Sequence, residues 1–185
     1  MAMIKDKIFK LKNGATLCIR NPKASDAAAL IEYLKRMFGE TQFTLSEPDE
    51  FTMTVEEEVA LTDKRNNSEC DLALVAEIDG KIVSFLNFDE ERKRRISHTG
   101  YFGISVLKDY WGLGIATHMM DVLLAHARAS DKIELVLLRM HSTNEKAMSI
   151  YSKLGFVEYG RIPNELKFKD GTYVDTIIMG LDVRK

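Results

Sequence analysis

A glycine-rich turn joins a strand-like segment to an amphipathic segment in the second half of the chain. The turn reads Trp-Gly-Leu-Gly-Ile-Ala-Thr over residues 111–117 and follows the apolar run 102–106. Glycines at alternate positions let the main chain approach a ligand closely, and N–H groups at a helix start carry partial positive charge. We therefore expect this junction to bind a phosphate or pyrophosphate, with a simple tight connection as the alternative of about equal weight.

Two familiar nucleotide-binding patterns differ from this turn. The dinucleotide-binding fingerprint requires glycine or alanine where Thr117 stands, and it normally opens the first strand-turn-helix unit, whereas this turn lies past mid-chain. The phosphate loop of nucleoside triphosphatases ends in Gly-Lys-Ser/Thr, and no lysine occurs between Asp109 and Arg128. The sequence excludes that second class.

A second pattern lies downstream, in a segment that the residue spacing predicts to be helical. Asn144, Ala147, Tyr151 and Leu154 recur at intervals of three and four before Gly155, and such residues share one helix face. An amide and a phenol would then stand in line, with a small residue between them. An ordinary amphipathic helix with Asn144 as N-cap and Gly155 as its stop explains the ends equally well, but it gives no reason for the tyrosine.

Hydrophobic periodicity predicts an α/β fold whose central sheet is mixed and mostly antiparallel. Strands are expected at 15–20, 72–78, 81–88, 97–106, 133–140, 156–167 and 172–183, and helices from 27, from 54, from 114 and from 144. The strand-helix-strand order around the glycine turn implies one parallel, right-handed crossover. We expect about seven strands with helices on both faces, and a type I′ turn at Asp170-Gly171.

Taken together, the two patterns resemble the GCN5-related N-acetyltransferase superfamily, abbreviated GNAT. The resemblance covers most of the chain and is strongest from His98 to Phe156. It implies that the parallel junction is splayed, that the turn binds the pyrophosphate of acetyl-CoA through main-chain amides, and that the preceding strand pairs with the pantetheine arm. The implied cofactor-binding residues are Ile104, Ser105, Val106, Leu107, Trp111, Gly112, Leu113, Gly114, Ile115, Ala116, Thr117, Asn144, Ala147 and Tyr151. The chain departs from the family at Trp111, where arginine or glutamine is usual, and at Ala116, which replaces the last glycine.

The resemblance implies an N-acetyltransferase that moves an acetyl group from acetyl-CoA to a primary amine by direct attack in a ternary complex. An amine with a pKa of about 10.4 is only about 0.04% neutral at pH 7, so the site must lower that pKa or supply a base. Tyr151, protonated at this pH, is expected to be the catalytic acid that protonates the leaving thiolate; a packing tyrosine is the alternative. A main-chain N–H near Val106 or Leu107 is expected to stabilise the oxyanion.

The general base stays open on sequence grounds. His98, Tyr101, His141 and Glu77 lie on or beside predicted inner strands, but each residue type more often has a structural role, and a water chain is an alternative. Acceptor specificity is expected from 37–51 and from the last hairpin, 161–173. Acidic residues gather in the first of these segments and favour a cationic amine, with a solvated acidic loop as the alternative: Glu40, Glu47, Asp49 and Glu50.

Bulk properties predict one cytoplasmic domain over residues 1–185. The net charge of -2 argues against nucleic-acid and membrane partners, no membrane span is present, and the first seven residues lack the apolar core of a signal peptide. Cys18 and Cys70 have no metal-ligand spacing, so no metal is expected. The basic run 92–95 is expected to be a solvated hairpin loop. A homodimer and a non-catalytic acyl-CoA sensor with the same fold remain alternatives.

Overall fold

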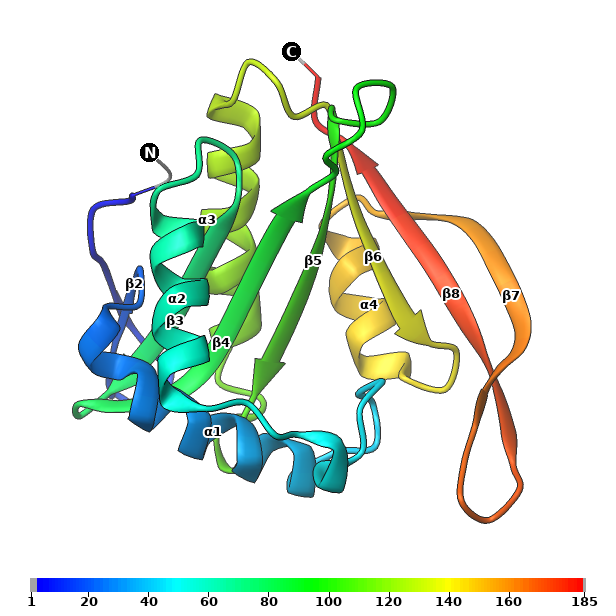
Figure 1. Ribbon diagram of the computed structural model, residues 1–185, viewed down its shortest axis with the longest axis horizontal. Helices are drawn as coiled ribbons and strands as arrows, with labels where there is room; N and C mark the ends of the chain where they lie inside the picture. The colour runs from blue at the N-terminus through cyan, green and yellow to red at the C-terminus, as the bar shows by residue number, and fades with distance from the viewer. Residues whose placement is uncertain (1–2, 185) are drawn as a thin grey trace.

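The computed structural model describes residues 3–184 as a central sheet flanked by helices (Figure 1). Met1, Ala2 and Lys185, the ends of the predicted domain, lie outside the described residues. The strands are β1 (Lys7–Lys10), β2 (Thr16–Arg20), β3 (Leu72–Ile78), β4 (Lys81–Glu90), β5 (Thr99–Val106), β6 (Leu135–His141), β7 (Val157–Lys167) and β8 (Tyr173–Asp182). The helices are α1 (Ala27–Glu40), α2 (Val55–Asn66), α3 (Ile115–Ala129) and α4 (Glu145–Lys153), with short 3-10 turns η1 (Ala24–Asp26), η2 (Pro48–Glu50) and η3 (Lys108–Tyr110).

The predicted mixed sheet is confirmed, with eight strands in the described residues in the order β1-β2-β3-β4-β5-β6-β8-β7. Every neighbouring pair is antiparallel except β5 and β6, which are parallel. The strand that sequence analysis did not anticipate is β1, a four-residue edge strand paired with β2. Its four residues show too little alternation to be recognised as a strand, and pairing with β2 is what defines it.

Side-chain alternation along β3 divides the core between the two faces of the sheet. Leu72, Leu74 and Ala76 pack in the larger cluster with residues of α3 and α4, whereas Val75 packs in the smaller cluster with residues of α1. Successive side chains of a strand point to opposite faces, so β3 must be apolar throughout. Helices α1 and α2 therefore lie on one face and α3 and α4 on the other, as Figure 1 shows.

The parallel junction opens along its length. Strands β5 and β6 are paired only at Thr99 with Leu135, Gly100 with Val136 and Tyr101 with Leu137. Beyond these pairs β5 continues against β4 as far as Val106, and β6 continues against β8 as far as His141. The expected splay is thus present, and we call the separated ends of β5 and β6 the open end of the junction and the paired ends its closed end.

The two Asp-Gly turns differ in conformation. At the β3–β4 hairpin both Asp79 (φ 49°) and Gly80 (φ 74°) are left-handed, as a type I′ turn requires. In the turn between β7 and β8, residues 168–172, only Gly171 is left-handed (φ 86°), with Gly171 N donating to Phe168 O and Phe168 N donating to Thr172 O. The expected type I′ turn at Asp170-Gly171 is therefore wrong: a three-residue loop closes this hairpin, and its third residue supplies the left-handed position.

Three further expectations concern the surface and the thiols. The basic run 92–95 forms an exposed loop between β4 and β5, as predicted. Both cysteines are free; Cys70 is buried and Cys18 is partly exposed. Among the described residues, no helix combines the length and the apolar character needed to cross a bilayer.

Candidate active site

The main chain of β5 faces the open end with two of the four residues expected to contact the cofactor. Leu107 N donates to Val83 O at 3.0 Å, so Leu107 turns its polar groups toward β4. Because this orientation alternates along an antiparallel strand, Ser105 also faces β4, whereas Ile104 and Val106 turn their N–H and C=O groups into the gap beside β6. Two main-chain N–H groups were expected as oxyanion donors. The Leu107 N–H is already bonded to β4, whereas the Val106 N–H does not face β4.

The glycine turn places the beginning of α3 next to this open strand. Gly112 (φ 77°) and Gly114 (φ 85°) are both left-handed, and Gly114 is the N-cap of α3. No side chain caps the helix, whose first turn closes with His118 N donating to Gly114 O at 3.1 Å. A helix leaves its first N–H groups without partners inside the helix. The buried Ile115 side chain anchors the turn in the core, so these N–H groups are held at the surface for an anion.

Trp111 lies across the mouth of the open end. Its indole Nε1–H donates to Val106 O at 2.7 Å, and Lys146 Nζ from α4 lies 5.6 Å from the ring centroid. The indole thus occupies one of the carbonyls that face the gap. It does not cover the glycine turn at Gly114, where an added Cβ would meet no atom within 4 Å apart from its chain neighbours.

Helix α4 is capped at both ends as expected for an ordinary amphipathic helix. Asn144 is the N-cap, and its Oδ1 accepts a hydrogen bond from Ala147 N at 3.2 Å. Gly155 follows the helix with φ 94°, a value suited to a glycine stop. The side-chain oxygen of Asn144 is therefore bonded to the helix, and its side-chain nitrogen is the group left to contact a ligand.

Tyr151 sits at the point where β5 and β6 begin to separate. Its ring packs edge-on against Phe102 at 5.6 Å and in a tilted arrangement against Phe156 at 5.9 Å, and only 8% of the residue is exposed. Burial raises the pKa of Tyr151 well above its ordinary value, so the phenol stays protonated. No protein hydrogen bond to its hydroxyl is found within the described residues, which leaves this proton available to a ligand.

A pocket of about 610 Å³ opens beside Trp111. Two segments that are far apart in the sequence form its walls, and they are the two expected to set acceptor specificity. From the last residues of α1 and the stretch that follows it come Phe38, Gly39, Glu40, Thr41, Gln42, Phe43, Thr44, Ser46, Glu47 and Pro48, and from the β7–β8 hairpin come Phe168, Lys169 and Asp170.

The acidic residues of this region are only partly available to a ligand. Glu40 accepts from Lys108 N at 2.7 Å and from Arg36 Nε at 2.6 Å, so it fastens the end of α1 to the turn before Trp111. Glu47 and Asp49 lie 3.4 Å and 3.6 Å from Lys169 Nζ across the pocket rim. An ammonium group of the protein itself therefore occupies the position expected for a cationic acceptor.

The structure separates the four base candidates by position. Glu77 is committed to Arg20, with Glu77 Oε2 3.1 Å from Arg20 Nε, and it lies on β3, two strands away from β5. His98 precedes β5 at the closed end, where His98 O accepts from Glu134 N at 2.8 Å. Tyr101 pairs with Leu137. His141, the last residue of β6, is the candidate that lies at the open end.

Comparison with known proteins adds the family. The sequence pattern of the Acetyltransferase (GNAT) family matches residues 28–156, well over half of the chain. The chain belongs to the GNAT family. This matched range contains the glycine turn, Asn144 and Tyr151, but the β7–β8 hairpin that closes the pocket lies beyond it.

Individual GNAT proteins resemble the chain over different lengths. The acetyltransferase of the GNAT family from Streptococcus pneumoniae is 30% identical with a TM-score of 0.87, over 90% of this chain and 99% of that one. YncA from Salmonella typhimurium, whose structure contains its cofactor acetyl-CoA, is 21% identical with a TM-score of 0.78 over 90% and 94% of the two chains. L-amino acid N-acetyltransferase AaaT from Escherichia coli (strain K12) is 30% identical over 106 residues, 57% of this chain and 65% of AaaT. The chain spans less than two thirds of the length of the curated relatives that it matches.

GNAT enzymes use acetyl-CoA, and the residues at the open end suit its parts. The helix start offers N–H groups for a diphosphate, and the gap offers main-chain donors and acceptors for an amide-bearing arm. Three contributors to the site were not identified from sequence: Phe43 and Phe168, which line the pocket, and Lys169, which bridges its rim. All three lie in loops, and the spacing of residues in a loop does not predict which loops meet in the fold.

Proposed function

We propose that this single domain is an acetyl-CoA-dependent N-acetyltransferase that acts on the primary amine of a small molecule or peptide. The observation that carries the proposal is the position of Trp111. This residue begins the glycine turn, donates to a carbonyl in the strand gap and lines the 610 Å³ pocket. A cofactor held at the turn and the gap would therefore present its thioester to an acceptor in that pocket.

The cofactor is proposed to bind mainly through the main chain. Its pyrophosphate is assigned to the N–H groups at the start of α3, and its pantetheine arm to the Ile104 and Val106 groups that face the gap. Because Trp111 occupies Val106 O in the free protein, the arm takes that carbonyl only after the indole has moved. Pairing of an extended ligand with an open strand edge is a general recognition mode.

The acceptor is proposed to be a primary amine carrying positive charge. Glu47 and Asp49 bind the Lys169 ammonium at the rim, so a cationic acceptor would reach these carboxylates by displacing that ammonium. AaaT is an L-amino acid N-acetyltransferase by name, and an amino acid or a short peptide is compatible with a pocket of about 610 Å³.

Each chemical role is assigned to a group at the open end. The Val106 N–H is proposed to stabilise the oxyanion, since Leu107 N is bonded to Val83 O. Tyr151 is proposed to protonate the departing thiolate, because its hydroxyl is protonated and has no protein partner among the described residues. The acetyl group passes directly from sulfur to the amine nitrogen in a ternary complex.

Release of free thiol from acetyl-CoA tests the proposal with a panel of polyamines, aminoglycosides, amino acids and peptide amines. We expect amine-dependent release with at least one class, together with the acetylated amine in the products. Tight acetyl-CoA binding without release for any amine would contradict the transferase and favour the non-catalytic sensor. Absence of acetyl-CoA binding would contradict both.

A further inference from the structure

His141 differs from the other histidines in being buried without a hydrogen-bond partner. It is 5% exposed, and neither Nδ1 nor Nε2 has a partner within the described residues. By contrast, His126 Nε2 lies 3.1 Å from Cys70 O, and His118 stacks on Phe9 at 4.2 Å. Buried polar groups are normally satisfied. The main chain of Thr44 acts on the ring but makes no well-formed hydrogen bond to it, and it can serve only one nitrogen, so the other nitrogen is open to a ligand.

The ring of His141 lies behind the pocket wall, in contact with two aromatic residues of that wall. Phe43 contacts it edge-on at 5.9 Å with an interplanar angle of 84°, and Phe168 does so at 6.0 Å and 71°. Both phenylalanines line the pocket. One belongs to the stretch between α1 and α2 and the other to the β7–β8 hairpin, so His141 lies where the two pocket walls meet the end of β6.

We propose that His141 is a catalytic residue of the transferase, the general base that accepts a proton from the ammonium of the bound acceptor. The inference rests on the proposed function and adds the base that sequence analysis left open. The acceptor's amino group is assigned to the space between Phe43 and Phe168, within hydrogen-bond reach of one imidazole nitrogen. Aromatic rings on either side also suit a cation before it loses its proton.

The protonation state agrees with this role. Burial lowers the pKa of His141 below its ordinary range, and the nearby main chain of Thr44 opposes the shift in part. The imidazole is therefore neutral near pH 7 and has a lone pair to offer. Most charged groups on the surrounding elements form ion pairs: Arg139 with Glu165, Arg161 with Asp175, and Lys169 with Glu47 and Asp49. Asp170 lies at the tip of the β7–β8 hairpin.

The proton balance of the reaction is complete with these groups. The ammonium gives one proton to His141, which later releases it to water. The neutral amine then attacks the thioester carbonyl; its C–N bond forms as the C–S bond breaks, and the nitrogen gives up a second proton. Tyr151 protonates the thiolate sulfur and is reprotonated by that second proton through solvent. The products are the acetylated amine, free coenzyme thiol and one proton in solution.

Two substitutions at His141 and one matched control test the inference on the full chain. His141→Gln keeps a polar side chain that cannot take up a proton, and His141→Phe removes the unsatisfied nitrogens. His98→Gln makes the same change at the other end of the junction. Thiol release with the best amine of the panel, calorimetric affinity for acetyl-CoA and the melting temperature are measured for all three.

We expect both His141 variants to lose at least about 100-fold in kcat/KM and to bind acetyl-CoA within about twofold of the wild-type affinity. The Phe variant should melt no lower than the wild type. The rise of wild-type kcat/KM with pH through a pKa below 6.5 should be absent from His141→Gln. Wild-type turnover that persists in either variant would overturn the inference alone, as would a loss matched by equal loss of acetyl-CoA affinity. A wild type that acetylates no amine would refute the proposed function, and the inference with it.

Discussion

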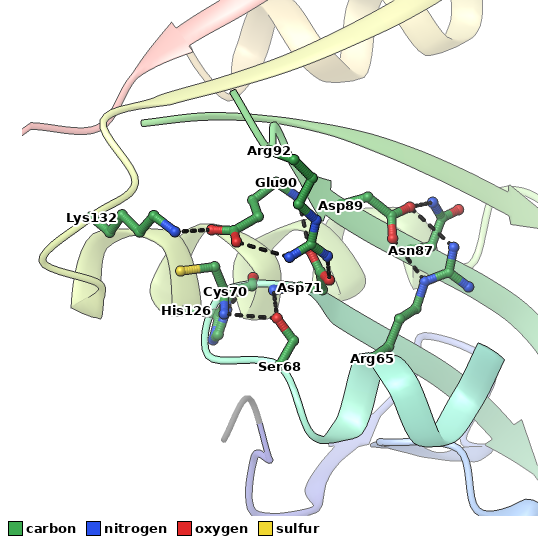
Figure 2. A network of polar contacts seen from close by, with 10 residues as sticks. All are labelled: Arg65, Ser68, Cys70, Asp71, Asn87, Asp89, Glu90, Arg92, His126 and Lys132. Atoms are coloured by element: carbon green, nitrogen blue, oxygen red, sulfur yellow. Dashed lines mark hydrogen bonds and ion pairs between the residues drawn. The ribbon is translucent and has the colours of Figure 1, made fainter. Parts of the chain in front are cut away.

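The two ends of the β5–β6 junction differ in how many of their polar groups are hydrogen-bonded within the protein. At the closed end, buried carboxylates and main-chain groups are bonded to side chains of the protein (Figure 2). At the open end, the N–H and C=O groups of Ile104, the N–H group of Val106, the Tyr151 hydroxyl and both nitrogens of His141 have no protein partner among the described residues. The contrast separates polar groups that stabilise the fold from the polar groups that we propose bind the ligand.

The network at the closed end pairs its buried carboxylates with cations and main-chain donors. Asp71 is almost fully buried, accepts from Glu90 N at 2.8 Å and pairs with Arg92. Glu90 also pairs with Arg92 at 3.1 Å and with Lys132 at 2.8 Å. Figure 2 shows these side chains pointing toward one another from the end of β4, from the residues just before β3 and just after β4, and from the segment after α3. Such a network fastens the strand ends together, and it leaves nothing for a ligand to replace.

The largest expected effect comes from comparing two buried tyrosines. Tyr33 OH donates to Ser105 O at 2.9 Å, whereas the Tyr151 hydroxyl has no such partner within residues 3–184. Tyr151→Phe should lower kcat about 100-fold and leave the melting temperature within about 1 °C. Tyr33→Phe should instead cost about 1 kcal/mol of stability. Turnover and thermal melting of both variants check the pair, and unchanged turnover in Tyr151→Phe would disprove the acid role.

A substitution at the closed end should have the converse effect. Asp71→Ala removes an acceptor for the Glu90 N–H and leaves Arg92 without its buried partner. We expect the free energy of unfolding in urea to fall by about 2–3 kcal/mol, with acetyl-CoA affinity unchanged. Weakened cofactor binding together with wild-type stability would mean that the two ends are not separable.

The glycine turn provides a test with a close internal control. Gly114 (φ 85°) and Gly80 (φ 74°) are both left-handed, and an added Cβ meets no atom within 4 Å at either position. Alanine at each site should therefore cost a similar backbone strain of about 1 kcal/mol. Only Gly114→Ala should also weaken acetyl-CoA binding, by about tenfold, since its methyl group enters the space assigned to the pyrophosphate. Equal affinities for the two variants by calorimetry would count against that assignment.

The smallest expected effect is the pH dependence of the closed end. Burial alone would raise the pKa of Asp89, but the hydrogen bonds from Arg65 at 2.9 and 3.0 Å outweigh it and lower the pKa. A carboxylate with a lowered pKa stabilises the fold above its unfolded pKa of about 3.9, and this contribution disappears as the pH falls through the folded value. Asp89→Asn should flatten the loss of stability below about pH 4 by less than about 1 kcal/mol, because the side chain is partly exposed. Identical urea stability curves for variant and wild type at pH 3 and pH 7 would contradict this.

The fold and the cofactor half of the site were predictable because their signals are local. Hydrophobic periodicity identified the buried strands, and the order of elements required one parallel junction. The glycines at 112 and 114 marked the turn itself, and the structure shows that both are left-handed, a conformation that few other residues adopt at low cost.

The acceptor half could be located but not built from sequence. Parts of the segments 37–51 and 161–173 line a pocket, and their role in acceptor specificity stays a prediction. Nothing in their spacing showed that Phe43, Phe168 and His141 would meet. Those contacts depend on the fold of two loops and on how far β6 extends beyond β5. The lack of hydrogen bonds to the buried His141 nitrogens likewise results from packing. A histidine at the end of a strand is ordinary in sequence.

Two-dimensional amide NMR during an acetyl-CoA titration tests the central claim most directly. The account predicts that acetyl-CoA shifts the amide signals of Ile104, Val106 and residues 113–117, together with the single indole N–H of Trp111 as it leaves Val106 O. The amides of Asp71, Glu90 and His126 at the closed end should stay in place. Saturable shifts confined to other residues, or no shift at the glycine turn and the indole, would contradict the account.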